Sequence, residues 1–502
     1  MTDQSASVPT PFHSAVEILD SRARVSPDSR PYQVGDNLSP TYAEWANKSH
    51  AFARALLERG VRHGDRIGLL FAHPHWDEYA VAYMGVLRAG AVGVHLAPGL
   101  PPEELLRRLQ VTAPVAVVLG PRVTSPTGYL GWVATEAELT AAHPTGPPVN
   151  IAVGPLDFAD ILFTSGTTGP AKAFANPHGN LSFGEGPVQI GDFGTEDAPV
   201  LAPMPMGTPS SAGMVGMFAL TSRARIIVCP TDDVEEMARL VAQYRADTVM
   251  LVPWLATQFV MPESLSNKYD LSSVRTIAIA SAALPSSVAR RLLAAMPNAS
   301  ILTAYAQGEA VPAVVIGNYH PDHPLRLGKP ARHSELRVVV DGRDAAPGEL
   351  GEVWLRSPAP RRRYLSDLDD HDPDTWTRTG DLARFDDEGH LVLFDRQVDA
   401  ISTAVGLVSS LEVDEVLTQH PDVIQAASYA VERGQHPAQV QAQVVLRPGS
   451  TATEAELIEH AAQRLPAHAV PHRVGIRASF QRGLTKQGMT FKMGTKVTSA
   501  KA

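Results

Sequence analysis

Apolar residues recur along the first third of the chain with spacings that switch between those of helices and those of strands. Residues Tyr42 to Glu58 and Glu78 to Ala89 carry apolar side chains three and four positions apart, which predicts two amphipathic helices. The short apolar runs Arg66 to Phe71 and Val92 to Leu96 predict buried strands. Such an alternation indicates βα units around a largely parallel sheet.

The same alternation returns in the middle of the chain and then gives way to a different pattern. Helix and strand are predicted at Val234 to Tyr244 and Thr248 to Val252, and again at Ser287 to Ala295 and Ser300 to Ala304. Residues 331–395 instead form short β-like runs separated by Asp, Gly and Pro, which are typical of turns. We expect a smaller β-rich subdomain there.

A third region begins near Arg396 and is about the size of one small domain. Its own alternating pattern runs through Val413 to Thr418, Gln425 to Val431, Gln439 to Leu446 and Glu454 to Leu465. The expected fold class is therefore α/β. A large N-terminal domain of stacked βα subdomains with a β-rich part spans residues 1–395, and a small α+β C-terminal domain spans residues 396–502.

Composition narrows the class of protein. Hydrophobic residues make up 44% of the 502 residues and charged residues 19%, which excludes disorder over most of the chain. A net charge of -10 argues against general affinity for nucleic acid or anionic membranes and favours small-molecule chemistry. The start does not resemble a signal peptide, and no apolar run predicts a membrane span. The single Cys229 suits a reducing cytoplasm.

One segment, directly after the apolar run Ala159 to Phe163, concentrates the chemistry of phosphate binding. Gly166 and Gly169 can adopt positive φ, so that backbone amides converge on an anion. No G-x-x-x-x-G-K-[ST] occurs, which argues against an ordinary P-loop NTPase. The plainer alternative is a flexible surface loop. The polar donors are Thr164, Ser165, Thr167, Thr168 and Lys172.

The order of these residues resembles the phosphate-loop signature [ST]-S-G-[ST]-T-G-x-x-K of the adenylate-forming superfamily. That family includes acyl- and aryl-CoA synthetases, the adenylation domains of nonribosomal peptide synthetases and firefly luciferase. Further segments resemble the family's other motifs, in the family's order. They are Tyr42 to Glu44, Leu87 to Pro98, Ser281 to Pro285, Tyr305 to Ala310, Pro347 to Val353, Thr377 to Leu382 and Asp395 to Arg396.

The resemblance implies a site for MgATP. Asp381 would accept hydrogen bonds from the ribose hydroxyls, Tyr305 would stack near adenine, and Arg396 would reach the ribose or the phosphates. Thr168 and Glu309 would help to position Mg²⁺. The implied ATP- or AMP-binding residues are Thr164, Ser165, Gly166, Thr167, Thr168, Gly169, Lys172, Ser281, Ala282, Ala283, Tyr305, Gly308, Asp381 and Arg396.

The resemblance also places a pocket for the acid. Gly207 and Thr208 lie where many relatives carry an aromatic or histidine gate, so we expect room for an uncommon, bulky acid. The alternative is that this alignment is shifted by two residues. The implied substrate-binding residues are Met206, Gly207, Thr208, Gly213 and Ala306.

The chain departs from the family near its C-terminus. Met489 stands where the family has a late catalytic lysine, and a thioether cannot supply that charge. Lys486 or Lys492 would have to reach in from a shifted loop. The catalytic candidates are therefore Lys172, Glu309, Lys486 and Lys492.

The implied reaction is ATP-dependent activation of a carboxylic acid to an acyl-adenylate with release of pyrophosphate, followed by thioester formation with CoA. A mobile C-terminal domain would exclude water. The implied cofactors are ATP, Mg²⁺ and CoA. One alternative passes acyl-AMP to a phosphopantetheine carrier protein or a separate transferase, which Val398 at the family's hinge position would permit. Another is a catalytically impaired acyl-adenylate-binding protein, which Met489 favours.

Overall fold

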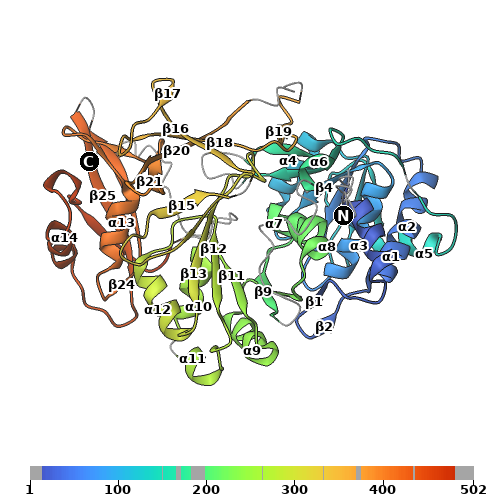
Figure 1. Cartoon of the computed structure of the whole chain (residues 1–502), viewed down its shortest axis with the longest axis horizontal. Coiled ribbons are helices and arrows are strands. Elements are labelled where there is room, and N and C mark those ends of the chain that lie inside the picture. Colours follow the sequence, from blue (N-terminus) through green and yellow to red (C-terminus); the bar gives the residue numbers. More distant parts are fainter. Residues whose placement is uncertain are drawn as a thin grey trace, which may run out of the picture. The chain divides into compact units, whose positions relative to one another are not determined.

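The computed structural model describes residues 14–149, 151–164, 171–182, 198–262, 264–331, 333–368, 375–433 and 436–480. Contacts divide the chain into two compact units, with the elements labelled in Figure 1. The first unit consists of the described residues of 1–164, 172–240 and 358–373, and the second of those of 165–171, 241–357 and 374–502. The predicted domain boundary at residue 395 stays a prediction.

The first unit contains a sheet with the strand order β19-β8-β7-β4-β3-β5-β6. Its middle strands run parallel, whereas β8 and β19 are added antiparallel at one edge. The strands are β3 Arg66–Leu70, β4 Val92–Leu96, β5 Ala116–Leu119, β6 Trp132–Thr135, β7 Phe158–Phe163, β8 Ala173–Pro177 and β19 Arg363–Tyr364. The helices of this part are α1 Ala15–Val25, α2 Tyr42–Glu58, α3 Trp76–Arg88, α4 Pro102–Thr112, α5 Glu136–Ala142 and α6 His178–Leu181.

A second set of strands in this unit pairs in the order β9-β10-β1-β2. They are β1 Tyr32–Val34, β2 Asn37–Leu38, β9 Val200–Pro203 and β10 Ile226–Cys229. Between β9 and β10 the chain forms α7 Pro209–Gly213, the π-helix η1 Met214–Phe218 and α8 Ala219–Thr221. A π-helical turn is rare and is found mostly at functional sites.

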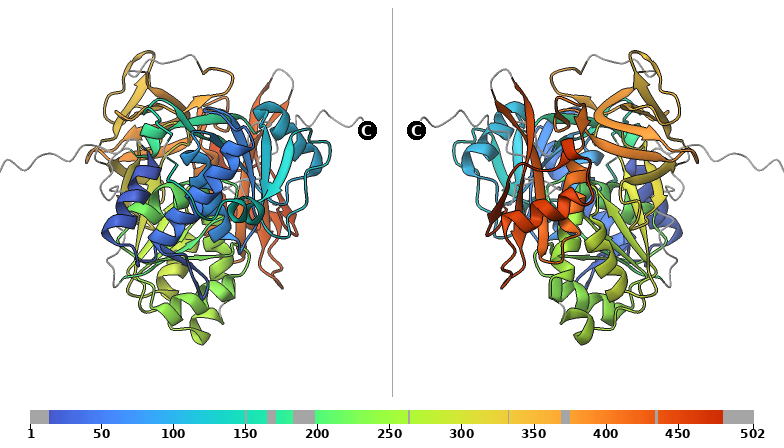
Figure 2. Two further views of the ribbon diagram at one scale, coloured as in Figure 1. Left: turned by 90° about the vertical axis from the view of Figure 1, so that its right-hand side faces the viewer. Right: turned by 90° about the vertical axis from the view of Figure 1, so that its left-hand side faces the viewer.

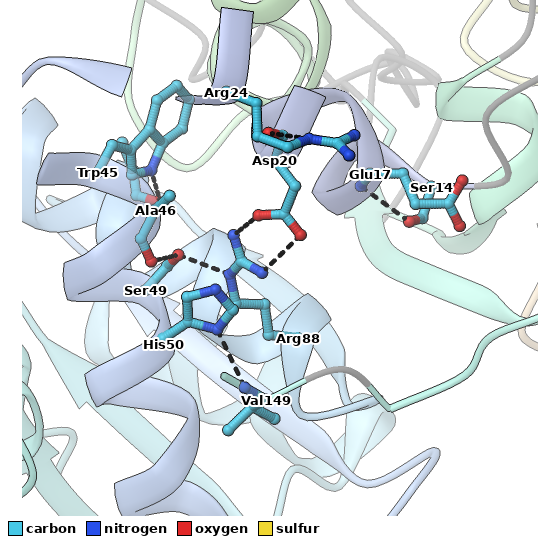
Figure 3. A network of polar contacts seen from close by, with 11 residues as sticks. Ser14, Glu17, Asp20, Arg24, Trp45, Ala46, Ser49, His50, Arg88 and Val149 are labelled. Atoms are coloured by element: carbon cyan, nitrogen blue, oxygen red, sulfur yellow. Dashed lines mark hydrogen bonds and ion pairs between the residues drawn. The ribbon is translucent and has the colours of Figure 1, made fainter. Parts of the chain in front are cut away.

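A buried arginine ties the first three helices together (Figure 3). Arg88, at the end of α3, is only 1% exposed. Its Nη1 and Nη2 donate to the carboxylate of Asp20 on α1 at 3.1 and 2.5 Å, and its Nε donates to Ser49 Oγ on α2 at 2.7 Å. Because a buried charge is tolerated only when it is paired and hydrogen-bonded, these contacts fix the relative positions of the three helices.

The second unit carries the strand order β17-β16-β18-β20-β21-β15-β14-β13-β12-β11. Strands β11 to β13 are parallel, and the strands from β14 onward pair antiparallel, as expected for the β-rich part. The parallel part consists of β11 Thr248–Leu251, β12 Thr276–Ala280 and β13 Ser300–Tyr305, with α10 Pro253–Val260, α11 Leu265–Lys268 and α12 Ser286–Ala295. Helix α9 Val234–Tyr244 precedes β11 and includes the boundary between the two units, after residue 240. The remaining strands are β14 Val315–Asn318, β15 Arg326–Pro330, β16 Glu335–Val340, β17 Arg343–Asp344, β18 Gly351–Arg356, β20 Thr377–Phe385 and β21 Leu391–Arg396.

The end of the chain adds a small α+β part to the second unit. The hairpin β22 Ile401–Ser402 and β23 Leu407–Val408 precedes a three-stranded sheet of β24 Val423–Arg433, β25 His436–Leu446 and β26 Val474–Arg477. The helices α13 Ser410–Thr418 and α14 Glu454–Ala462 share one apolar core with this sheet (Figures 1 and 2). A short 3₁₀ turn spans Ala467–Ala469.

The predicted helices and strands are confirmed, with ends that agree to within three residues. The α/β class is likewise confirmed. No helix of the described ranges is both long and apolar enough to cross a membrane.

A second buried polar cluster lies in the first unit, between α3 and the strands β4 and β7. Tyr83 Oη donates to Asp160 Oδ2 at 2.5 Å, and Tyr79 Oη lies 2.7 Å from Nδ1 of His95. His95 Nε2 is 3.9 Å from Asp160 Oδ2. Burial raises the pKa of Asp160 to about 6, against the opposing effects of Tyr83 and Arg362, and burial lowers the pKa of His95 to about 3. At neutral pH the fold therefore holds a buried carboxylate beside a neutral imidazole.

The Asp160 carboxyl should make stability depend on pH. Its pKa is 3.8 in the unfolded chain and about 6 in the folded one, so the folded state binds the proton more tightly and loses stability as pH rises from 4 to above 6. Asp160→Asn keeps an oxygen for Tyr83 and removes the charge. We expect this variant to be more stable than the parent at pH 8, with the gain shrinking towards pH 4, in urea unfolding curves.

The control for that experiment is Asp387→Asn, which removes an exposed carboxylate. This variant should change the free energy of unfolding only slightly, and by the same amount at pH 4 and at pH 8. If Asp160→Asn raised the free energy of unfolding equally at pH 4 and pH 8, the raised pKa of Asp160 in the folded state would be contradicted.

Candidate active site

The ends of the predicted phosphate loop are tied to each other in the first unit. The backbone N of Thr164 donates to the carbonyl of Lys172 at 2.9 Å, and the backbone N of Lys172 donates to Thr164 Oγ1 at 3.0 Å. These bonds continue the pairing of β7 with β8, in which Phe163 lies opposite Ala173. The loop therefore leaves and re-enters the sheet at one point.

Lys172 is placed by an aromatic ring. Its Nζ lies 5.5 Å from the ring centroid of Tyr364 on β19, within the range of a cation–π interaction. Tyr364 in turn pairs with Phe174 on β8. Sequence analysis did not single out Tyr364, because it is almost two hundred residues away and only the β8–β19 pairing brings it here.

Several predicted residues lie outside the described residues. They are Ser165, Gly166, Thr167, Thr168 and Gly169 of the loop, and Lys486 and Lys492 near the C-terminus. Their assignments stay predictions.

The predicted acid-binding residues follow β9 in the first unit. Met206 is buried, and Gly207 has a φ of 71°. A Cβ on Gly207 would lie 2.2 Å from the carbonyl oxygen of Leu96, at the end of β4. Glycine is therefore required there for close packing against the backbone, and the extra room that we expected at this position is already filled.

Open space is found instead beside Gly213, later in the same segment. No described atom comes within 4 Å of a Cβ built on Gly213, in α7. Thr208 is the N-cap residue of α7, and its backbone N donates to Ser211 Oγ at 3.1 Å, while its Oγ1 donates to the carbonyl of Pro205 at 2.7 Å. Gly213, rather than Gly207, offers room beside this helix.

In the second unit, a buried carboxylate gathers the predicted nucleotide residues. Asp381, on β20, is 5% exposed. Its Oδ2 accepts hydrogen bonds from Tyr305 Oη at 2.7 Å and from Gln307 Nε2 at 3.1 Å. Arg396 lies directly opposite on β21, with its Nε 3.5 Å from Asp381 Oδ1. Burial and the Asp381 charge raise the pKa of Tyr305, so its hydroxyl keeps its proton and donates.

Two residues that sequence analysis missed shape this cluster. Gln307 also donates to the carbonyl of Thr379 at 2.7 Å, so it links the segment that follows β13 to the first half of β20. Glu352, in the G-E-L-G-E-V segment, accepts from the backbone N of Gly380 at 3.3 Å and from Arg378. Both are polar residues inside segments that resemble family motifs, and this position in the sequence could have identified them as candidates.

The remaining predicted residues of this unit also lie at strand ends. Ser281, Ala282 and Ala283 form the turn after β12, and Ser281 has a φ of 81°. Because Ala280 pairs with Ala304, this turn lies beside Tyr305 at the carboxyl ends of two parallel strands. Ligands of open α/β sheets bind at such ends. Ala306, Gly308 and Glu309 follow directly, with Ala306 exposed and Glu309 half-buried.

Among the side chains that the structure describes, no cluster of three or more His, Cys, Asp or Glu is arranged to hold a metal ion. Glu309 offers one carboxylate near the end of β13. This arrangement fits a Mg²⁺ ion that arrives with phosphate oxygens and retains waters, because such an ion needs only one or two protein carboxylates.

Comparison with known proteins agrees with this geometry. The family model described as AMP-binding enzyme matches residues 19–365, and the one described as AMP-binding enzyme C-terminal domain matches residues 412–486. The chain is 26% identical over 480 residues to 4-coumarate–CoA ligase-like 9 of Arabidopsis thaliana, covering 88% of this chain and 81% of that protein.

Two solved structures share the fold. The anthranilate CoA ligase AuaEII, in complex with anthranoyl-AMP, superposes with a TM-score of 0.83 at 21% identity and 97% coverage of both chains. The amide bond synthetase McbA of Marinactinospora thermotolerans superposes with a TM-score of 0.77 at 25% identity, covering 94% of this chain and 97% of its own. The chain therefore belongs to the AMP-binding enzyme family and is an AMP-forming ligase of the adenylate-forming superfamily.

Proposed function

We propose that the chain activates a carboxylic acid as its acyl-adenylate and transfers the acyl group to the thiol of CoA. In the first step an oxygen of the acid attacks the α-phosphorus of ATP, and pyrophosphate leaves. In the second step the thiolate of CoA attacks the acyl carbon, and AMP leaves. Enzymes accelerate such displacements mainly by positioning the reactants and stabilising charge on oxygen.

The observation that carries this proposal is the cluster around Asp381. Its carboxylate is a buried acceptor suited to the two hydroxyls of a ribose, and Tyr305, Gln307 and Arg396 hold it in place. Lys172 would contact the phosphates, together with the loop residues from Ser165 to Gly169. Mg²⁺, with Glu309 and Thr168 as its proposed ligands, would neutralise charge on the leaving pyrophosphate.

We infer that the acid is aromatic or similarly bulky. The names of the relatives 4-coumarate–CoA ligase-like 9 and anthranilate CoA ligase AuaEII support an aromatic acid. The open space beside Gly213 supports a large one. We also place the reaction in the cytoplasm, where the buried free thiol of Cys229 would stay reduced.

A second candidate is transfer of the acyl group to an acceptor other than CoA, such as a phosphopantetheine carrier protein. Val398 stands at the family's hinge position, and the structural likeness to an amide bond synthetase favours an acceptor that is not CoA.

The direct test is to incubate the protein with MgATP and a panel of aliphatic and aromatic acids, and to follow pyrophosphate release. We expect release that depends on an aromatic acid, and an acyl-CoA product by mass spectrometry when CoA is present. Acyl-AMP that accumulates unchanged in the presence of CoA would favour the second candidate. Absence of acid-dependent pyrophosphate with every acid would contradict both.

Variants of the Asp381 cluster test the nucleotide assignment. Asp381→Asn should raise the KM for ATP about tenfold to hundredfold, because a charged acceptor is lost. Gln307→Ala removes two hydrogen bonds within this cluster and should raise the KM for ATP about fivefold. The matched control is Gln110→Ala, which removes an exposed glutamine side chain of α4 and should leave the KM for ATP unchanged in steady-state assays. Unchanged values in both site variants would refute the assignment.

The missing lysine is tested by replacing Lys486 and Lys492 singly with alanine. If one of them supplies the charge at the reacting phosphate, its loss should slow pyrophosphate release about a hundredfold, as for removal of other transition-state donors. Lys496→Ala, a nearby lysine, serves as the control. Full adenylation rates in both test variants would rule out the shifted-lysine hypothesis.

A further inference from the structure

The helix that follows the Ser281 to Pro285 turn lacks a cap of its own. Helix α12 starts at Ser286, and its N-cap residue is Pro285, whose side chain cannot accept a hydrogen bond. Its first turn contains no Asp or Glu. The first amides of a helix have no intrahelical partners and carry partial positive charge, so this end requires an acceptor from elsewhere.

That acceptor comes from the C-terminal part of the chain. Glu415, on α13, accepts a hydrogen bond from the backbone N of Ser286 at 3.0 Å through its Oε2, and a short one from Ser286 Oγ through its Oε1. Ser286 is 1% exposed. A carboxylate at this place satisfies both the helix end and a buried hydroxyl, and hydrogen bonds of this charged kind are among the stronger ones.

Neighbouring residues fix both partners of this contact. Gln419, the residue directly after α13, donates to Glu415 Oε1 at 3.0 Å and so orients the carboxylate. On the other side, Tyr319 Oη donates to the carbonyl of Leu284 at 2.8 Å, and Tyr319 is 8% exposed. The end of the turn is therefore held between a tyrosine of the sheet and a glutamate of α13.

Helix α13 is anchored to the nucleotide cluster as well. Asp395, 1% exposed at the end of β21, accepts from the backbone N and the Oγ of Ser410 at 2.6 and 2.7 Å, and from the backbone N of Arg396 at 2.7 Å. The same helix thus contacts the strand that carries Arg396 and the turn that carries Ser281 to Ala283. Both segments hold predicted nucleotide contacts.

We propose that Glu415 is a positioning residue of the nucleotide site, which holds the Ser281 to Pro285 turn in its binding conformation from the C-terminal part of the chain. The proposal rests on the proposed function for the assignment of that turn to adenine. Because Ser281 occupies the left-handed backbone region, which is unfavourable for a serine, the turn needs such support from outside. Nucleotide affinity then depends on whether α13 is docked.

The test measures AMP binding by calorimetry, since it needs neither the acid nor turnover. Glu415→Ala should weaken AMP binding about tenfold, within the usual range of coupling between sites. Glu415→Gln keeps an oxygen for Ser286 and should recover most of the affinity. Glu412→Gln, which removes an exposed carboxylate from the same helix, is the matched control and should bind AMP like the parent.

Steady-state kinetics separate positioning from general damage. In Glu415→Ala the KM for ATP should rise in parallel with the AMP dissociation constant, while kcat at saturating ATP stays within about threefold of the parent. A purely structural role would instead lower the melting temperature and kcat without this split, and would overturn the proposal.

The remaining outcomes are also decisive. An AMP dissociation constant within twofold of the parent in folded Glu415→Ala would overturn the proposal. If Glu415→Ala does not fold, Ser286→Ala, which loses only the hydroxyl, should still weaken AMP binding about threefold, and an unchanged value would overturn it. Failure of the parent protein to bind AMP would refute the proposed function itself, and the inference with it.

Discussion

The hydrogen bonds and ion pair of the Asp381 carboxylate are the interactions on which the cluster of predicted nucleotide residues depends. The carboxylate is buried, and it joins β20 to β21 through Arg396 and to the end of β13 through Tyr305 and Gln307. A buried charge is stable only while its partners stay in place, so none of these side chains can move without disturbing the others. The motifs that contain Tyr305, Asp381 and Arg396 are thereby held together by one carboxylate.

From this carboxylate, contacts continue around the second unit. Arg396 is followed back along β21 by Asp395, which binds the start of α13, and α13 reaches the start of α12 through Glu415. Helix α12 begins where the Ser281 turn ends, beside Tyr305. The predicted nucleotide residues and the first helix of the C-terminal part therefore form one closed series of contacts.

The first unit obeys a different constraint, that of close backbone packing and buried charge. Arg88 fixes three helices through Asp20 and Ser49, and the strand after it ends where Gly207 approaches Leu96. The segment predicted to bind the acid thus lies directly against the end of β4. Any side chain at position 207 would displace this segment, since the contact there is with backbone rather than with a flexible side chain.

Local patterns in the sequence were sufficient to predict the helices and strands. Hydrophobic spacing predicts the helices and strands because it reports which face of each element is buried. The resemblance of Thr377 to Leu382 and of Tyr305 to Ala310 to family motifs singled out Asp381 and Tyr305 as candidates. The tertiary structure alone decided what Gly207, Gln307, Glu352 and Glu415 do. Their roles depend on partners up to 129 positions away, as for Glu415 and Ser286, and only the pairing of strands and the packing of helices brings such residues within hydrogen-bonding distance.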